Sequence, residues 1–438
     1  MKLKRLKLSR FAWITIAIIA IFAVSIAAMG YYYYIMPHPT RLRILYTHPD
    51  SMVNEIADDF KEWHGRPIKV TLTPIDPQSA YETVTNLYKK PEAEIWWGGP
   101  PSIFEEACDS LLAYNSTNRS ENITVHSCPL MDLNQSTPRW YAASLQGLGV
   151  MYNETSPLKP QTWTDLLKEE CEGNITMVDP TESEFTQPFI MLMIQSKSWT
   201  QGWKYLVKLA AFVKDYDNNE TTSALKVTSG YLPLAVVPDF YAYNRIQELE
   251  QIGIHSTDFT YLNATVLQPD PIAIIKRGKY LEEAKAFVDY ILTKRAQDII
   301  GKYRLPIRPD AMVVSPRINP FDPNFPSVSN YNKTFEEVGK DIIKAYYRTW
   351  ITERHDEEPS IRTAWKEIKE ANESSPYYAP AWNNFTRAGY YMNRTSIDTI
   401  YSATEGWTKN LESYVNSWSV ARIEAYNYAI ENAKKAQT

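Results

Sequence analysis

Strand and helix patterns alternate along the stretch that follows residue 40, and this alternation constrains the fold more than any other feature of the chain. The patterns predict strands at 41–47, 67–75 and 93–97, with helices over 52–65, 79–90 and 102–115. Such a β-α-β order is typical of a parallel, doubly wound sheet with helices on its faces. The third strand, AEIWW, is followed directly by GGPP. We expect the strand to end there, because glycine and proline do not continue a regular strand.

A second α/β unit follows from about residue 140. WYAASLQGLGVMYN (140–153) is extended and apolar, Thr162 is placed to cap a helix that starts at Trp163, and the strand within 231–246 breaks at Pro238. A further strand and turn at 266–278 and an amphipathic helix after it indicate a return to the first unit. From about residue 330 the chain consists of long helical stretches rich in tyrosine and tryptophan, which predict a helical extension packed on the core.

The N-terminus carries a membrane signal. Residues 1–10 are basic, and the next twenty, FAWITIAIIAIFAVSIAAMG, have no charge. A run of about 20 apolar residues spans a bilayer, and the basic side stays in the cytoplasm. We therefore expect a cytoplasmic tail (1–10), a transmembrane anchor (11–35) and an extracellular remainder. A cleaved signal peptide is the alternative, since Ser25, Ile26 and Ala27 offer a site for cleavage.

Acceptor motifs for N-glycosylation are dense in the part that would lie outside, and roughly half of all asparagines begin one. This density favours a glycosylated external domain on an archaeal cell surface. The asparagines are Asn115, Asn118, Asn122, Asn134, Asn153, Asn174, Asn219, Asn263, Asn332, Asn372, Asn384 and Asn393.

Cysteine content and charge narrow the function further. Cys108 and Cys128 bracket a loop that holds three of these motifs, so an external pair there is expected to oxidise to a disulfide. No cysteine and histidine spacing fits zinc, and no cofactor is expected.

The net charge of −5 gives no reason to expect nucleic acid as a partner. Histidine, serine and glycine motifs of hydrolases or phosphate-binding loops are absent from the sequence, so we do not expect an enzyme.

Residues 41–312 resemble a substrate-binding protein of ABC importers, of the two-lobed type 2 class that includes the iron(III)-binding proteins. The resemblance is carried by AEIWWGGPPSIFEEACDSLLAYN, GLGVMYNETSPLKPQTWTDLL, NITMVDPTESEF and PDPIAIIKRGKYLEEAKAFVDYILTKRAQDIIGKYRLPIRPDA. It implies a type 2 periplasmic-binding-protein fold with two α/β lobes joined by two crossing strands. Lobe 1 would comprise 41–145 and 270–315, lobe 2 would comprise 150–265, and 330–438 would be a helical extension outside the resemblance.

The resemblance also implies a ligand-binding cleft between the lobes, at the ends of the strands. Lobe 1 would contribute the loops after its first and third strands, and lobe 2 the turn after DP and the start of a helix. Aromatic faces suit sugars or cations, and carboxylates suit a cationic ligand. The implied ligand-binding residues are Tyr46, Thr47, His48, Trp96, Trp97, Gly98, Gly99, Thr181, Glu182, Ser183, Asp239, Tyr241, Tyr243 and Asp270.

Two departures from the family pattern bear on the ligand. Glu184 stands where the family often has a glycine beside an anion-binding helix terminus, which weighs against an anion. Tyr241 and Tyr243 are separated by an alanine, whereas iron-binding members often carry adjacent tyrosines. The expected partners are a small molecule or ion and an ABC permease in the same membrane. A surface adhesion protein and a glycan-acting enzyme are the alternatives.

Overall fold

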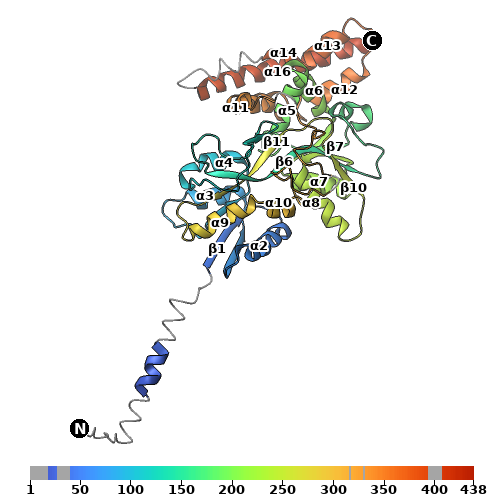
Figure 1. The fold of residues 1–438 in the computed structure, drawn as a ribbon. Helices are drawn as coiled ribbons and strands as arrows, with labels where there is room; N and C mark the ends of the chain where they lie inside the picture. The colour runs from blue at the N-terminus through green and yellow to red at the C-terminus, as the bar shows by residue number, and fades with distance from the viewer. Residues whose placement is uncertain (1–17, 27–39, 315–316, 329–330, 393–406) are drawn as a thin grey trace, which may run out of the picture.

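A computed structural model describes residues 18–26, 40–314, 317–328, 331–392 and 407–438 of the chain (Figure 1). The predicted basic tail lies outside the described residues, and the predicted anchor is covered only at 18–26, which are helical and exposed. Within the described ranges, no helix has both the length and the apolar character needed to cross a membrane.

One mixed sheet organises the described part of the chain, with nine strands in the order β2-β1-β3-β11-β6-β9-β7-β8 and β10 beside β6. We call its β2, β1, β3 and β11 the first half. The strands β1, β2 and β3 are parallel, as the alternation predicts, and β11 runs antiparallel to β3. Their bounds are Thr40–Tyr46 (β1), Ile68–Pro74 (β2), Ile95–Trp97 (β3) and Leu267–Ile274 (β11).

The second half of the sheet contains β9, β7, β8 and β10. The strands β9, β7 and β8 are mutually parallel, which matches the second predicted α/β unit. The sequence pattern did not indicate β8 or β10. The bounds are Leu234–Pro238 (β9), Ile175–Val178 (β7), Val213–Asp217 (β8) and Thr257–Thr260 (β10).

The long strand β6 (Trp140–Asn153) belongs to both halves. Its residues from Trp140 to Gly147 pair with β11, and those from Leu148 to Tyr152 pair with β9. The pairing partner thus changes at Gly147, in the middle of a strand whose first twelve residues are all buried. β6 and β11 are the segments that the resemblance implies as crossings.

Helices cover both faces of each half. Those of the first half are α2 (Asp50–His64), α3 (Pro77–Thr85), α4 (Pro101–Glu106), α9 (Leu281–Ile291) and α10 (Lys294–Ile300). Those of the second half are α5 (Pro188–Lys197), α6 (Trp199–Phe212), α7 (Glu220–Thr228) and α8 (Asp239–Glu250). The segment after Thr162 forms a 3-10 turn, η2 (Trp163–Leu167), with the predicted cap in place.

The C-terminal helices pack on the second half. Buried side chains of α11, α12, α13 and α16 form one continuous apolar cluster with those of β7, β9, α5 and α6. Figure 1 shows these helices gathered at one end of the molecule over α5 and α6, at the opposite end from β1 and α2. The described helices of this extension are α11 (Lys333–Trp350), α12 (Ile361–Glu370), α13 (Tyr378–Phe385), α14 (Ala388–Tyr391) and α16 (Trp407–Gln437).

Candidate functional site

The loops after β1 and β3 lie against each other at one end of the first half. The backbone N–H of Thr47 donates to the carbonyl oxygen of Trp97 at 3.2 Å, and that of Gly98 donates to Pro271 at 2.8 Å. Gly98 has φ of +97°, a conformation that favours glycine. A Cβ there would lie 2.2 Å from Oγ1 of Thr47 and 2.8 Å from Nε2 of His48, so only glycine allows the two loops to approach this closely.

The two tryptophans of β3 point to opposite faces of the sheet, because side chains alternate along a strand. Trp96 is fully buried and stacks on Phe104 with ring centroids 3.8 Å apart. Trp97 is also buried, and its ring lies 4.7 Å from that of His48 in an edge-to-face contact. Both tryptophans therefore fill the core, and Trp97 is the one that contacts His48. Tyr46, also buried, donates from its hydroxyl to Asp50 at 2.6 Å.

A buried charged cluster surrounds His48. Its Nε2 lies 3.2 Å from Oδ2 of Asp270, and its Nδ1 lies 3.2 Å from Nη1 of Arg304. Arg304 also approaches Asp270, with Nη2 3.7 Å from Oδ1, and Ser144 of β6 donates to Oδ2 of Asp270 at 2.9 Å. The exposed fraction of His48, Asp270 and Arg304 is 7%, 4% and 4%. The cluster therefore sits in a low-dielectric environment where a lone charge is costly.

The charge state of His48 follows from this burial. Burial lowers the pKa of the imidazole to about 4; Asp270 opposes this shift and Arg304 adds to it. The ring is therefore neutral near pH 7 and carries one N–H. Since a guanidinium only donates, Nδ1 accepts from Arg304 and the proton sits on Nε2, facing Asp270. One positive and one negative side chain thus share the cluster with a neutral ring.

Arg304 connects this cluster to the second half. Its guanidinium carbon lies 4.3 Å from the ring centroid of Phe240, which follows Asp239 at the start of α8. Oδ2 of Asp239 accepts from the backbone N–H of Gly147 at 3.1 Å and from the hydroxyl of Tyr261 at 2.8 Å. Burial raises the pKa of Asp239 to about 6, against the hydrogen bond from Tyr261 and the charge of Arg304. Asp239 is therefore tied to the point where β6 changes partner.

Tyr241 and Tyr243 diverge from one another. Tyr241 packs on Phe240 with ring centroids 4.0 Å apart, whereas Tyr243 lies under the guanidinium of Arg317 at 4.2 Å. Burial raises the pKa of both phenols, which keeps them protonated near pH 7. In the described ranges, no group of three or more histidine, cysteine or acidic side chains is arranged to hold a metal ion. The arrangement does not favour coordination of a ferric ion by this tyrosine pair.

The turn after β7 contacts the C-terminal extension. Thr181 is fully buried, and its hydroxyl lies 3.4 Å from Nε of Arg348 on α11. The same guanidinium pairs with Glu182. Ser183 donates to the carboxylate of Glu220. The side chains of these three candidates thus contact Arg348, Glu220 and the backbone N–H of Phe185.

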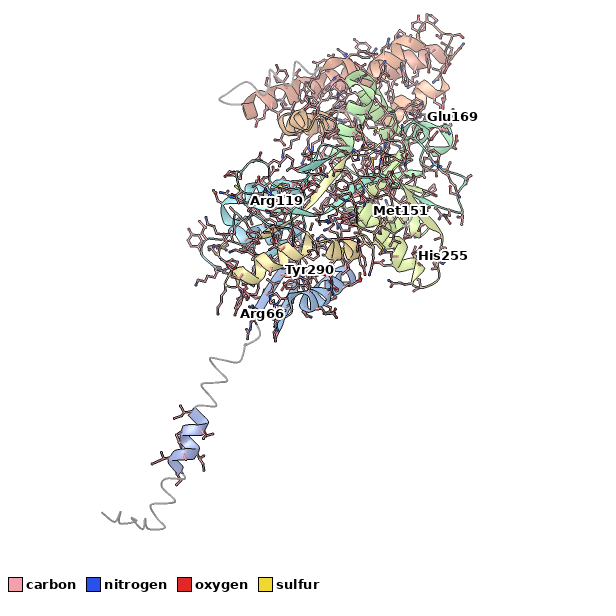
Figure 2. The ribbon with its side chains drawn as sticks, viewed as in Figure 1. Arg66, Arg119, Met151, Glu169, His255 and Tyr290 are labelled. Carbon is pink, nitrogen blue, oxygen red and sulfur yellow. The ribbon has the colours of Figure 1, made fainter. Side chains whose placement is uncertain are left out.

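Glu184 links the two halves directly. The hydroxyl of Ser102, at the start of α4, donates to its carboxylate. Gln268 of β11 donates from Nε2 to the backbone oxygen of Glu184 at 3.2 Å. Together with the contact between Arg304 and Phe240, these bonds join the two halves. Met151 of β6, labelled in Figure 2, lies in the part of the strand that pairs with β9 and β10 of the second half, and it is fully buried.

The structure brings together His48, Trp97, Gly98 and Asp270, all implied by the resemblance. It adds residues that the sequence reasoning did not single out, which are Arg304, Phe240, Ser144 and Gly147. Arg304 lies in KYRLPIRP, a segment that carries the resemblance to the family. Its place in that segment was the only feature of the sequence that could have identified Arg304 as a site residue.

The structure shows no bond between Cys108 and Cys128, and the disulfide between them stays a prediction. Cys108 lies in η1 (Cys108–Ser110), and its sulfur accepts from Nη1 of Arg139 at 3.0 Å. Cys128 lies in the short strand β5 (Cys128–Pro129), with its sulfur 3.8 Å from the carbonyl oxygen of Pro129. Each sulfur is thus directed at a different neighbour. Cys171 is buried.

The glycosylation motifs lie at the surface wherever the structure describes them. Asn393 lies outside the described residues, and none of the other predicted acceptor asparagines is buried. Three of them use their side-chain N–H groups in bonds to backbone oxygens, namely Asn118, Asn174 and Asn384. Exposure is what attachment of a saccharide requires, and occupancy stays a prediction.

Comparison with known proteins identifies relatives. Residues 111–345 match the family described as bacterial extracellular solute-binding protein. The phosphoglycerate transport regulatory protein PgtC of Salmonella typhimurium is 25% identical over 178 residues, which are 38% of this chain and 43% of that protein. This chain therefore spans less than half of the length of that relative. An uncharacterised protein of Haemophilus influenzae is 23% identical over 63% of this chain and 80% of its own length.

Solved structures show the same fold. The periplasmic binding protein AfuA from Actinobacillus pleuropneumoniae, with fructose-6-phosphate bound, has a TM-score of 0.55 at 18% identity, over 72% of this chain and 99% of that one. The ferric binding protein from Campylobacter jejuni has a TM-score of 0.50 at 21% identity, over 63% and 89%. The mixed sheet with its two halves is thus the α/β fold of periplasmic binding proteins.

Proposed function

Because this chain belongs to the family of bacterial extracellular solute-binding proteins, we propose that it captures a small solute outside the cell, closes on it and delivers it to an ABC permease. Residues 41–145 with 270–315 form one lobe in this proposal, residues 150–265 form the other, and β6 and β11 are the hinge. The family is described as solute-binding, and a relative as a phosphoglycerate transport regulatory protein, which supports a binding protein rather than an enzyme.

The observation that carries the proposal is the polar cluster between the two halves. Asp270, His48 and Arg304 come from three separate segments of the first half, and Arg304 reaches Phe240 of the second. Buried polar groups at the meeting of two α/β units are what a solute cleft requires, since closure excludes water and strengthens each hydrogen bond. The closed contacts through Glu184 then represent the state in which the solute is enclosed.

In this proposal the solute contacts side chains of both halves. His48, Trp97, Asp270 and Arg304 form one wall, and Asp239, Phe240 and Tyr241 form the other. The turn at Thr181, Glu182 and Ser183 lies at the boundary with the extension. In this proposal it lines the entrance through which the solute reaches the cleft.

Membrane attachment completes the proposal. Residues 11–35 anchor the chain, residues 1–10 stay in the cytoplasm, and the described body lies outside, where its asparagines carry glycans. An anchored receptor remains close to the permease, so that capture and delivery take place at a high effective concentration.

Mass spectrometry of small molecules released from the purified, full-length protein by denaturation tests the function. Small-angle scattering before and after removal of that solute then measures closure. A defined solute whose removal increases the radius of gyration supports the proposal, and a protein that releases none and gains no thermal stability from any solute contradicts it.

A further inference from the structure

Four polar atoms between the two halves have no hydrogen-bond partner although their side chains are buried. They are Oε1 of Gln146, Oδ1 of Asp239, Nε of Arg304 and Nε2 of His48, the last of which lies 3.2 Å from Asp270 without forming a hydrogen bond to it. The exposed fraction is 3% for Gln146 and 2% for Asp239, and it stays below a tenth for the other two. A buried polar group without a partner costs about 1–3 kcal/mol of folding free energy. Four such groups in one region therefore indicate a bound molecule that forms hydrogen bonds with them.

These atoms belong to one continuous network. Gln146 precedes Gly147, whose N–H is bound by Asp239, and Asp239 precedes Phe240, on which Arg304 stacks. Arg304 in turn donates to His48. Gln146 also donates from Nε2 to Gln268 at 3.1 Å, which leaves its oxygen as a fixed acceptor. The network therefore offers two acceptors, on Gln146 and Asp239, and two donors, on Arg304 and His48.

The charges in this network balance. Asp270 lies 3.7 Å from Arg304, and Asp239 faces Arg304 and Arg317 through space. His48 is neutral near pH 7, as argued above. Two carboxylates and two guanidiniums leave no surplus charge, and a solute with net charge would enter a dry site without a counter-ion, which is costly.

Resting on the proposed function, we propose that the solute is a neutral polyhydroxylated molecule, a sugar or a polyol, bound by Gln146, Asp239, Arg304 and His48. A hydroxyl group both donates and accepts, so adjacent hydroxyls satisfy acceptors and donors together. A metal ion only accepts lone pairs and leaves the two donors unsatisfied, and a phosphate brings a net negative charge that this balanced network does not neutralise.

Thermal unfolding of the full-length protein with four groups of probes tests the solute class. The neutral group is glucose, trehalose, maltose, sorbitol and myo-inositol; the others are phosphorylated (glucose 6-phosphate, 3-phosphoglycerate), zwitterionic (glycine, glycine betaine) and metallic (ferric citrate). We expect a rise in the melting temperature with at least one neutral probe and with no other group. A rise only with a phosphorylated, zwitterionic or metallic probe overturns the solute class and leaves the proposed function intact, whereas no rise with any probe contradicts both.

Salt dependence and a matched pair of variants then test the residues. For the neutral probe with the largest shift, the dissociation constant should change less than about twofold between about 0.05 and 0.5 M salt, because no charge is screened. Gln146→Met removes one acceptor and should weaken binding roughly tenfold. Gln195→Met makes the same change on α5, where the side chain of Gln195 accepts from the backbone N–H of Asn332, and should leave affinity within about twofold. Equal affinities of the two variants, or a steep salt dependence, would contradict the assignment.

Discussion

The guanidinium of Arg348 lies 3.4 Å from the hydroxyl of Thr181, so a residue of α11 just beyond the matched family region contacts a loop of the second half. The same arginine pairs with Glu182, and Asp179 accepts from the backbone N–H of Thr181 at 2.8 Å. The turn after β7 is therefore fixed from two sides. One of these is supplied by the C-terminal extension, which the family model does not cover beyond residue 345.

Replacement of Arg348 by alanine should loosen this turn. Loss of the guanidinium removes the contacts to Thr181 and Glu182, so amide hydrogen exchange of residues 179–187 should accelerate by roughly tenfold. The global melting temperature should change little, since both partners of the ion pair are partly exposed. Arg245→Ala, which breaks an exposed pair with Glu248 on α8, is the control. Unchanged exchange in the turn would show that α11 does not position it.

Alanine at Gly98 should destabilise the folded protein by about 2–4 kcal/mol, because its Cβ collides with Thr47 and His48 and the backbone is strained at positive φ. Gly173→Ala is the matched control: φ is +71° there, but nothing lies within 4 Å of a new Cβ. It should cost only about 1 kcal/mol, from strain alone. Urea unfolding of both variants measures the difference, and equal losses would mean that the loops after β1 and β3 adapt.

Asp239 should make stability fall as the pH rises. Its pKa is about 6 in the folded protein, against ~3.9 for an exposed carboxyl. Between these values the folded protein binds more protons than the unfolded chain, so this stabilising contribution is complete below about pH 4 and is lost as the pH rises through about 6. The wild-type protein should therefore lose about 3 kcal/mol relative to Asp239→Asn between about pH 3.5 and 6.5. Urea unfolding at a series of pH values measures this, and a constant difference would place Asp239 in a wetter site.

His48 should act in the opposite direction. Its pKa is about 4 in the folded protein and ~6.5 when exposed. The unfolded chain binds more protons between these values, so this contribution is present above about pH 6.5 and is lost as the pH falls to about 4. The wild-type protein should lose about 3 kcal/mol relative to His48→Gln on acidification. The exposed His255, labelled in Figure 2, provides the control variant His255→Gln. A parallel pH profile for His48→Gln and wild type would contradict the buried, neutral state.

Much of the fold follows from local patterns, because alternation and helical spacing report burial directly. The predicted helix over 79–90 ends early, at Thr85, since the side chain of Asn86 accepts from the backbone N–H groups of Tyr88 and Lys89. The predicted helix over 102–115 gives way after α4, because Leu112 donates to Ile274 of β11 instead of continuing the helix. In both cases a contact that spacing does not encode overrides propensity.

The candidate site was accessible from sequence only in part. The glycines after β3 indicated a sharp loop. His48 closely follows β1, and Asp270 is a polar residue within the apolar strand β11, at its irregularity beside Pro271. Arg304 and Phe240 belong to different halves and meet only in the folded chain, and their sequence separation hides this contact. Of the two tryptophans implied as cleft residues, Trp96 lies on the other face of the sheet from Trp97 and is covered by Phe104.

The shared apolar core of the second half and the extension has a mechanical consequence. Trp203 of α6 and Tyr346 of α11 pack at right angles with centroids 4.8 Å apart, and both are fully buried. Helices joined in this way cannot slide past the strands beneath them without opening a void. The extension therefore moves with the second half as one body. A small rotation of that body about the point where β6 changes partner would displace α16 by a larger distance than the strands near that point.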